Sequence, residues 1–375
     1  MKQSSKKIND KILCILLLSL SFLLMLALFF TKDKSFSEKE NRSLKTMPRF
    51  TLESVTSGKY FSEFSRYCQD QFPSRDFFTS ASSIIDLSMR RNESNGIIVV
   101  KDKKLISRHD YEDHEILKEN LRAISSFIEK NNTRELPTFI AVAPRSIDVN
   151  TEALPIFFPQ NYGKLEYREL YSFIPKSSLI DTYQALKNNY DDFYNTDHHW
   201  TTNGAYLAYV EIAKKLGVEP YHIDYFNIET VSKDFLGTSF SRSGLFDFKN
   251  KDSILLYRYE NDDNLTIKSG EKFLNLYDTT ALKTNDKYRV FLGGNTDLLQ
   301  IRNQEKKPKL LLIKDSFANS VIPFLSLHFD IDVIDLRYYM DSVSSHIEKN
   351  DFDSVLLLYG IDTIATEESC YRVEK

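Results

Sequence analysis

The stretch KLLLIKDSFANS, residues 309–320, decides the fold of this chain. It begins with a short apolar run, which is typical of a strand buried inside a parallel sheet. The run leads directly into Asp315 and Ser316 and then into an apolar helical pattern. We therefore expect Ser316 beyond the carboxyl end of a strand and in the first turn of a helix, where open α/β sheets bind their ligands.

Strands and helices alternate on both sides of this stretch. Alternation of this kind predicts an α/β fold with a doubly wound, mostly parallel sheet. Residues 218–285 are polar and weakly patterned, and they predict a loop-rich insertion. Apolar runs predict strands at 138–143, 178–181, 288–292, 309–313, 331–334 and 354–358, and helical spacing predicts helices at about 112–130, 203–216, 317–327 and 341–348.

A long apolar run near the N-terminus predicts a membrane segment. Residues 12–30 contain no charge and are long enough to cross a bilayer as one helix. Four lysines and one aspartate precede the run, so we expect the N-terminus in the cytoplasm and the rest of the chain outside it. A cleaved signal peptide is the alternative, but the run is long and ends in LFFTK, without a small-residue cleavage site. We favour an uncleaved anchor.

The expected organisation has four parts. After the anchor comes a polar linker, then helical stretches interrupted at residues 72–76, then a small hairpin at 97–106. The parts are a basic tail at 1–11, the anchor at 12–30, the linker at 31–50 and one α/β domain at 51–375.

Composition excludes several classes of protein. The 375 residues are 42% apolar and 27% charged, which excludes a disordered or collagen-like chain. The net charge of -4 argues against a dedicated nucleic-acid binder, and the mean hydropathy of -0.37 argues against a polytopic membrane protein. Cys68 and Cys370 are either one long-range disulfide or two free thiols. No zinc-ligand spacing occurs, so we expect no metal and no cofactor.

The stretch NTDHHWTTNG, residues 195–204, gathers Asp197, His198, His199 and the single tryptophan of the chain at a predicted helix start. One interpretation is a solvated polar turn with the tryptophan packed inward. A metal site is a second interpretation, although adjacent ligands on one short turn rarely converge on one ion. Catalysis is the third, because a histidine oriented by a carboxylate is a general base.

Ser316 supplies the complementary chemistry. A serine hydroxyl is a useful nucleophile at neutral pH when a histidine takes its proton and a carboxylate orients that histidine. Asp197, His199 and Ser316 are therefore the candidate catalytic residues. Ser316 acting only as a helix N-cap is the structural alternative. Gly294 and Asn295, after the apolar run at 290–292, are candidates for oxyanion or substrate binding.

The segment TDHHWT, residues 196–201, resembles the name-giving motif of the DHHW family of bacterial envelope proteins. That family is similar to the alginate O-acetyltransferase-like branch of the SGNH hydrolase superfamily. The resemblance implies an SGNH hydrolase-like fold with flavodoxin-like layering. It extends over most of the chain after the predicted anchor, through SEKENR at 37–42, DQFPSR at 70–75, GGN at 293–295, KDSF at 314–317 and DLRYY at 335–339.

The resemblance implies roles for single residues. Asp197 orients, His199 is the general base and Ser316 carries the acetyl group, whereas His198 occupies a variable position. The order Asp, His, Ser differs from that of ordinary SGNH hydrolases, so roles in the oxyanion site transfer less directly. Asn319, one turn after Ser316, is a further candidate for support or substrate contact.

The function expected is that of a membrane-anchored O-acyltransferase acting on hydroxyls of a cell-envelope polysaccharide, with a multi-span membrane protein as acyl donor. An esterase using the same residues and a non-catalytic glycan-binding or scaffold protein are the alternatives. Residues 1–34 carry a net charge of +4 and the rest -8, which favours a neutral or amino-bearing acceptor. Catalysis requires the Ser316 hydroxyl within about 3 Å of a His199 ring nitrogen, with Asp197 at the other nitrogen.

Overall fold

The computed structural model describes residues 2–37, 42–89, 91–100, 104–108, 114–149, 154, 164–187 and 189–374. The chain forms two compact units. Parts of three predictions lie outside the described residues, namely 38–41 of the linker, 101–103 of the hairpin turn and 112–113 at a helix start. The first unit comprises Met1–Arg91 with Gly244–Phe246, and the second comprises Asn92–Ser243 with Asp247–Lys375.

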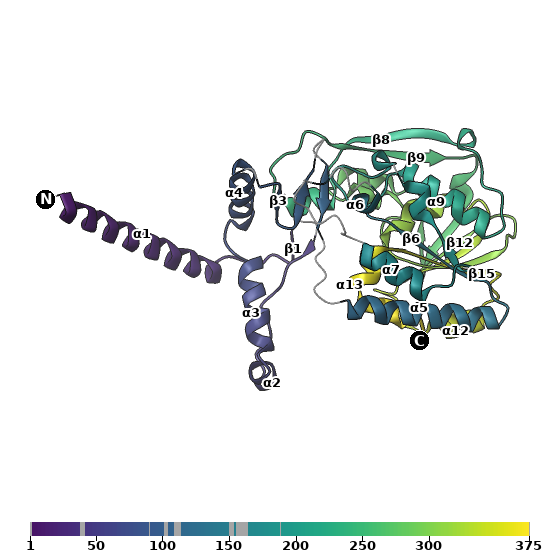
Figure 1. The fold of residues 1–375 in the computed structure, drawn as a ribbon, viewed down its shortest axis with the longest axis horizontal. Helices are drawn as coiled ribbons and strands as arrows, with labels where there is room; N and C mark the ends of the chain where they lie inside the picture. Colours follow the sequence, from purple (N-terminus) through teal and green to yellow (C-terminus); the bar gives the residue numbers. More distant parts are fainter. Residues whose placement is uncertain are drawn as a thin grey trace. The chain divides into compact units, whose positions relative to one another are not determined.

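The first unit begins with α1 (Lys2–Phe30), drawn in purple in Figure 1. Its window Lys11–Leu28 has a mean hydropathy of 2.6, so α1 is long and apolar enough to cross a membrane or to serve as a signal. The other elements of the unit are the paired strands β1 (Phe36–Ser37) and β2 (Arg42–Ser43) and the helices α2 (Leu52–Thr56), α3 (Lys59–Asp70) and α4 (Arg75–Ser88). The break between α3 and α4 coincides with the interruption predicted at 72–76.

The second unit is built on an eight-stranded mixed sheet, in the order β11-β10-β12-β14-β13-β15-β6-β7. The five strands from β14 to β7 are parallel, whereas β12, β10 and β11 are joined by antiparallel pairs. The strands are β6 (Thr138–Ala143), β7 (Leu179–Ile180), β10 (Thr266–Ser269), β11 (Lys272–Leu274), β12 (Leu298–Arg302), β13 (Lys309–Lys314), β14 (Asp330–Ile334) and β15 (Ser354–Gly360).

The sheet confirms the α/β class but not the expectation of a doubly wound, mostly parallel sheet. The antiparallel strands come from residues 266–302, where apolar residues alternate with polar ones over only a few positions. Such short alternating runs are half-exposed strands, and they are harder to recognise than continuous apolar runs.

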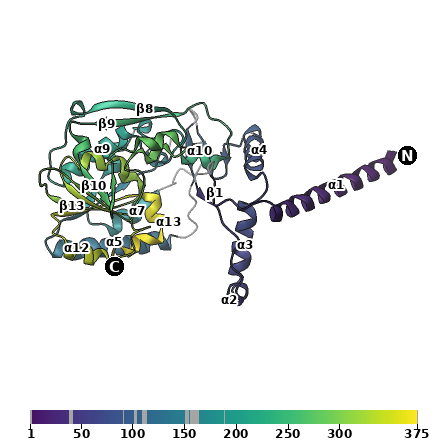
Figure 2. The same cartoon turned by 180° about the vertical axis from the view of Figure 1, so that it is seen from behind.

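Helices lie on both faces of the sheet, with α9 on one face and α5 and α12 on the other (Figures 1 and 2). The side chains of β13 alternate between these faces, as a pleated strand requires. Leu310 and Leu312 pack in the core on the α9 face, and Leu311 and Ile313 pack in the core on the α5 face. The covering helices are α5 (Glu115–Thr133), α9 (Thr202–Lys215), α12 (Val343–Lys349) and α13 (Ile361–Thr366).

A small sheet and several short elements complete the second unit. The hairpin predicted at 97–106 is confirmed by the antiparallel pairing of β4 with β5. The elements are β3 (Glu93–Ser94), β4 (Ile97–Val99), β5 (Leu105–Ser107), α6 (Ser146–Val149), α7 (Lys164–Phe173), α8 (Thr182–Leu186), η3 (Tyr190–Asp192), η4 (Ile223–Tyr225), η5 (Asp262–Asn264), η6 (Thr279–Lys283) and η9 (Glu368–Glu374).

Three predictions of local structure are wrong. Residues 218–285 contain β8 (Asn227–Phe235), α10 (Thr238–Ser243) and β9 (Asp252–Arg258) as well as β10 and β11, rather than loops alone. The strand predicted at 288–292 is instead a 3₁₀ turn, η7 (Lys287–Val290), because the Phe291 N–H donates to Tyr288 O at 3.2 Å. The helix predicted at 317–327 is divided into η8 (Ser316–Ser320) and α11 (Ile322–Leu325).

All three cysteines are free thiols. Of the two alternatives for Cys68 and Cys370, the structure therefore contains the unpaired form.

Candidate active site

The turn at residues 195–200 lies between a buried strand-like segment and α9. Its two ends are joined by an antiparallel bridge between Phe193 and Trp200, and Thr201 caps α9 by accepting from the Gly204 N–H. The Asp252 carboxylate, at the start of β9, accepts hydrogen bonds from the Asn195 and Thr196 backbone N–H groups, both at 2.8 Å. The turn is thus held by a strand that the sequence did not predict.

Ser316 begins the turn η8 directly after strand β13, as predicted. The cap of this turn is Asp315, whose side chain accepts from the Phe317 N–H at 2.9 Å. The structural alternative for Ser316 is therefore not what is observed, because a neighbouring residue performs the capping. The Ser316 hydroxyl is left to interact with His199.

Asp197, His199 and Ser316 form one hydrogen-bonded chain. His199 Nδ1 lies 2.6 Å from Asp197 Oδ1, and His199 Nε2 lies 2.8 Å from Ser316 Oγ. Asp197 and His199 are buried, whereas Ser316 is half-buried. The geometry stated above as the requirement for catalysis is therefore met. Of these three residues, Ser316, the candidate nucleophile, is the one that is partly exposed.

Asp197 is fixed by further donors. Its Oδ1 accepts from the His199 N–H at 2.9 Å, and its Oδ2 accepts from the Thr238 N–H at 2.8 Å and hydroxyl at 3.1 Å. Burial alone would raise the pKa of Asp197. The opposing interactions with His199, His198 and these donors outweigh burial and lower the pKa below its ordinary value. Asp197 is therefore held as a carboxylate.

The His199 ring is oriented by aromatic neighbours. The Tyr288 ring stacks on it with centroids 4.0 Å apart and an angle of 8°, and the Phe317 ring meets it edge-on at 4.8 Å. The Trp200 Nε1–H donates to Phe317 O at 3.1 Å and to Ser320 Oγ at 3.0 Å. Trp200 thereby ties the histidine turn to the serine turn, which fixes the spacing between His199 and Ser316.

A buried lysine organises the amides beside Ser316. Lys314 Nζ donates to Asn295 Oδ1 at 2.6 Å and to Asn319 Oδ1 at 2.7 Å, and Asn319 Nδ2 donates to Asn295 Oδ1 at 3.1 Å. The Lys314 ammonium also lies 3.7 Å from the buried Asp335 carboxylate. Burial lowers the pKa of Lys314 to about 8.

These contacts separate the predicted oxyanion residues. Gly294 has a φ of 110° and shapes the turn, but its N–H donates to Phe291 O at 3.2 Å. Asn319 uses both ends of its amide within the lysine network. Asn295 accepts two hydrogen bonds at Oδ1, and its Nδ2 makes no hydrogen bond among the described residues. Asn295 Nδ2 is therefore the donor still available to a ligand.

The metal interpretation applies to Asp197, His198 and His199, whose ligand atoms lie within 4.8 Å of one another. Both ring nitrogens of His199 already have partners, and His198 Nδ1 lies 2.6 Å from Thr238 Oγ1. An ion at this place would have to replace the contact between His199 and Ser316 or that between His199 and Asp197.

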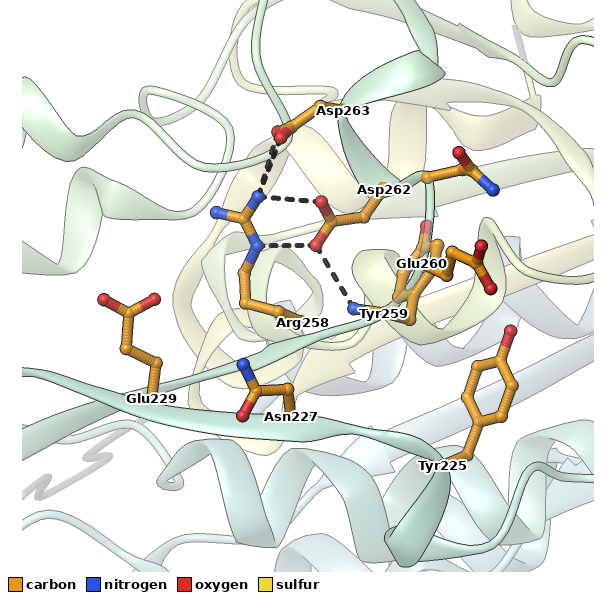
Figure 3. A pocket seen from close by; sticks show the side chains of 9 residues that line it. Tyr225, Asn227, Glu229, Arg258, Tyr259, Glu260, Asp262 and Asp263 are labelled. Atoms are coloured by element: carbon orange, nitrogen blue, oxygen red, sulfur yellow. Dashed lines mark hydrogen bonds and ion pairs between the residues drawn. The ribbon is translucent and has the colours of Figure 1, made fainter.

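A separate pocket of about 560 Å³ lies along β8 and β9 (Figure 3). Its lining does not include Asp197, His199 or Ser316. Arg258 is neutralised there by Asp262, with Nε donating to Oδ2 at 2.6 Å, and by Asp263 at 3.0 Å. The remaining lining consists of Tyr225, Asn227, Glu229, Tyr259, Glu260 and Asn261.

Thr238, Asp252 and Tyr288 contact the site from segments without a recognisable motif, so the sequence does not point to them. Lys314 and Asp335 lie within the segments 314–317 and 335–339 that resemble the DHHW family. Their contact with each other depends on the parallel pairing of β13 with β14.

Comparison with known proteins agrees with the sequence motif. Residues 163–334 match the family model described as DHHW protein, which confirms the resemblance to the DHHW family. None of the curated proteins compared with this chain matches it in sequence.

Two solved structures show the same fold. A DHHW family protein from Eubacterium siraeum is 20% identical over 75% of this chain and 95% of that chain, with a TM-score of 0.60. Bacillus cereus PatB1 with a sulfonyl adduct is 19% identical over 74% of this chain and 100% of that chain, with a TM-score of 0.62. A weaker likeness, with a TM-score of 0.47, is to the O-acetyltransferase domain of Pseudomonas putida AlgJ, at 14% identity over 72% of this chain and 93% of that chain.

Proposed function

We propose that this chain, whose residues 163–334 match the DHHW family, is an extracytoplasmic O-acyltransferase that acetylates hydroxyls of a cell-envelope polysaccharide. The observation that carries the proposal is the hydrogen-bonded chain from Ser316 through His199 to Asp197. A hydroxyl, an imidazole and a buried carboxylate in this order are the parts of a serine nucleophile. The resemblance of the motif at residues 196–201 to the alginate O-acetyltransferase-like branch supports acyl transfer to a glycan.

In the first half-reaction, Ser316 Oγ attacks the carbonyl carbon of the acyl donor while His199 Nε2 takes the hydroxyl proton. Asp197 accepts from Nδ1–H, which keeps the other nitrogen free to act as the base and stabilises the imidazolium that forms. The tetrahedral intermediate collapses when His199 returns the proton to the leaving group. The product of this half-reaction is an acetyl ester on Ser316.

In the second half-reaction, a sugar hydroxyl attacks the acetyl-serine and gives its proton to His199 Nε2. Collapse of the second intermediate releases the acetylated sugar, and the proton returns to Ser316 Oγ. Ser316, His199 and Asp197 thus act in both half-reactions.

The negative oxygen formed in both intermediates needs a hydrogen-bond donor. We assign this role to Asn295 Nδ2. Lys314 and Asn319 act as positioning residues, because their hydrogen bonds to Asn295 Oδ1 turn the amide nitrogen to the opposite side. Gly294 supports the role through the shape of its turn rather than through its N–H.

The proposed location follows from α1. We propose that α1 is an uncleaved single-pass anchor with the N-terminus in the cytoplasm, which places residues 31–375 on the outer side. The acyl donor is then a multi-span membrane protein that delivers the acetyl group across the bilayer, as the family resemblance implies.

An esterase is the second candidate function. Ser316 is half-buried, so water reaches the same ester that an acceptor sugar would attack. The two activities differ only in the attacking hydroxyl and are separated by an acceptor experiment.

The test uses the full chain in nanodiscs with p-nitrophenyl acetate as donor. We expect release of p-nitrophenol that is faster with an oligosaccharide acceptor, formation of an acetylated oligosaccharide, and no loss on treatment with EDTA. Both Ser316→Ala and His199→Ala should abolish release. An esterase would release the phenol without acetylating any sugar. Activity that persists in Ser316→Ala would refute the proposed nucleophile, and loss with EDTA would support the metal interpretation.

A further inference from the structure

Helix α4 (Arg75–Ser88) exposes the side chains that a helix normally buries. Phe77, Phe78, Ile84 and Ile85 are between 44% and 60% exposed. Positions i, i+1, i+7 and i+8 lie on one side of an α-helix, so these four side chains form a single apolar stripe. Exposed apolar patches of this kind mark interaction surfaces.

The inward face of α4 has the opposite character. Ser80 and Ser83 are fully buried, and the Ser83 hydroxyl donates to Thr79 O at 2.9 Å within the helix. Helix α4 thus buries serine side chains and exposes apolar side chains, which is the opposite of the usual arrangement.

The end of the preceding helix, α3, is fastened to the chain directly after α1. The Tyr67 hydroxyl donates to Asp33 Oδ1 at 3.0 Å. Gln71 accepts from the Lys34 N–H at 3.0 Å and donates to Lys34 O at 2.9 Å. Lys34 follows the last residue of α1 by four positions, which span at most about 14 Å of extended chain. The corner that leads into α4 therefore lies close to the end of α1.

The charge of the connecting segment agrees with a membrane surface. Residues 31–50 contain six basic and three acidic residues, a net charge of +3, whereas the whole chain is acidic. A basic segment next to an apolar stripe is attracted to anionic lipid headgroups.

From these observations we infer that α4 lies in the interface of the membrane that α1 spans, with its apolar stripe immersed in an anionic lipid surface. The inference rests on the anchoring part of the proposed function. In-plane helices of this kind insert their apolar face about 5–10 Å into the boundary between headgroups and acyl chains. Such a contact would hold the first unit against the bilayer at two places, α1 and α4.

The experiment places a tryptophan on α4 and measures its quenching by lipid. Phe77→Trp full-length chain is reconstituted into vesicles of phosphatidylcholine and phosphatidylglycerol, with and without bromine on the acyl chains. Trp200 is fully buried and contributes the same background to every variant. Leu18→Trp in α1 reports the anchor, and Phe273→Trp, a 70% exposed aromatic position on β11, is the matched control.

We expect brominated lipid to lower the emission of the tryptophans at positions 18 and 77 at least about twofold, and to leave that at position 273 unchanged. Adding Ile84→Asp and Ile85→Asp to the Phe77→Trp chain should abolish the quenching at position 77 while position 18 stays quenched in the same background.

Quenching at position 18 alone would overturn the docking of α4 and leave the anchor intact. If position 77 is shielded from acrylamide but not quenched by brominated lipid, a protein, such as a second copy of this chain, covers the stripe and the inference is wrong. Absence of quenching at both positions would overturn anchoring and docking together. Acyl transfer is not measured in any of these arms, so loss of the proposed activity would be recognised separately.

Discussion

Two buried aspartates, Asp197 and Asp315, hold turns of similar design. Each carboxylate accepts from the backbone N–H two residues further along the chain, in both cases at 2.9 Å. Each also accepts from one more backbone N–H and from a threonine hydroxyl. These donors are the Thr238 N–H (2.8 Å) and hydroxyl (3.1 Å) for Asp197, and the Gly360 N–H (2.7 Å) and Thr363 hydroxyl (2.6 Å) for Asp315.

The turns differ in the imidazoles near Asp197: the ring of His199 hydrogen-bonds to this carboxylate, and the ring of His198 lies 3.7 Å from it. Asp197 also meets the imidazole of His199, at 2.6 Å, whereas the hydrogen-bond donors on Asp315 among the described residues are N–H groups and a hydroxyl. In both turns a buried aspartate fixes the backbone through its carboxylate oxygens. A titratable partner is what distinguishes a turn suited to catalysis from a structural one.

Removal of the imidazole should give the largest effect. His199→Ala should lower transfer by about 10⁴-fold or more, because Ser316 loses its base while both turns keep their backbone hydrogen bonds. His198→Ala is the neighbouring control. Its ring contacts Thr238 rather than Ser316, so we expect less than about a tenfold change from slight displacement. Comparable losses in the two variants, measured as initial rates with an acetyl ester, would contradict the assignment of His199 as base.

Neutralising each aspartate should come next. Asp197→Asn should lower the rate by about 10⁴-fold, because the amide favours the wrong tautomer of His199. Asp315→Asn should lower the rate by no more than about 100-fold, through displacement of Ser316.

Asp315→Asn should lower the stability of the fold although it lowers the rate only moderately. Asp315→Asn leaves one donor facing an amide nitrogen and should lower the free energy of unfolding by about 1–3 kcal/mol in urea denaturation. An Asp315→Asn enzyme as inactive as Asp197→Asn would remove the distinction between the two turns.

A matched pair of glycines tests the same distinction with a smaller effect. A Cβ at Gly237 would lie 2.3 Å from the Asp197 carboxylate, and one at Gly360 would lie 2.7 Å from the Phe317 ring. Both Gly237→Ala and Gly360→Ala should cost about 1–3 kcal/mol through overpacking. Gly237→Ala should in addition lower the rate about 100-fold, more than Gly360→Ala, because it displaces the carboxylate that orients His199 directly, whereas Gly360→Ala reaches His199 only through the edge of the Phe317 ring. Equal rates in the two variants, at temperatures where both are folded, would argue against that coupling.

The smallest effect concerns pH and stability. The pKa of Asp197 is lower in the folded state than in the unfolded chain, so its stabilising contribution is full above the unfolded pKa of about 4 and is lost as the pH falls through the folded value. The difference in unfolding free energy between the wild type and Asp197→Asn should therefore narrow below about pH 4. Urea denaturation between pH 3 and pH 7 measures this difference, and a gap that widens on acidification would show that the sign is wrong.

The sequence predicted the parts of the molecule that are marked by continuous apolar runs or unusual residue types. Strands β6, β13, β14 and β15 are buried along all or nearly all of their length, and Asp197, His199 and Ser316 lie next to element boundaries that carry clear signals. The strands β10 and β12 were missed because only one of their faces is buried. Residues 288–292 carry an apolar run typical of a strand but include most of a 3₁₀ turn, because burial favours the same kind of run in both.

Contacts between segments that are distant in the sequence could not be predicted from it. Thr238 and Asp252 reach the turn at 195–200 from residues that show no periodicity, and Tyr288 meets His199 only through tertiary packing. In α4 the amphipathic spacing was recognisable, but no pattern indicates that the apolar face points outward. That reversal depends on what the neighbouring segments cover.

If Ser316 carries the acyl group, mass spectrometry of the full chain quenched during turnover with an acetyl ester should detect that group directly. We predict one acetyl group on the peptide that contains Ser316 in the wild type and in His198→Ala, and none in Ser316→Ala or His199→Ala. An acetyl group on another residue that forms and decays at the rate of turnover, or labelling that persists in Ser316→Ala, would contradict the account.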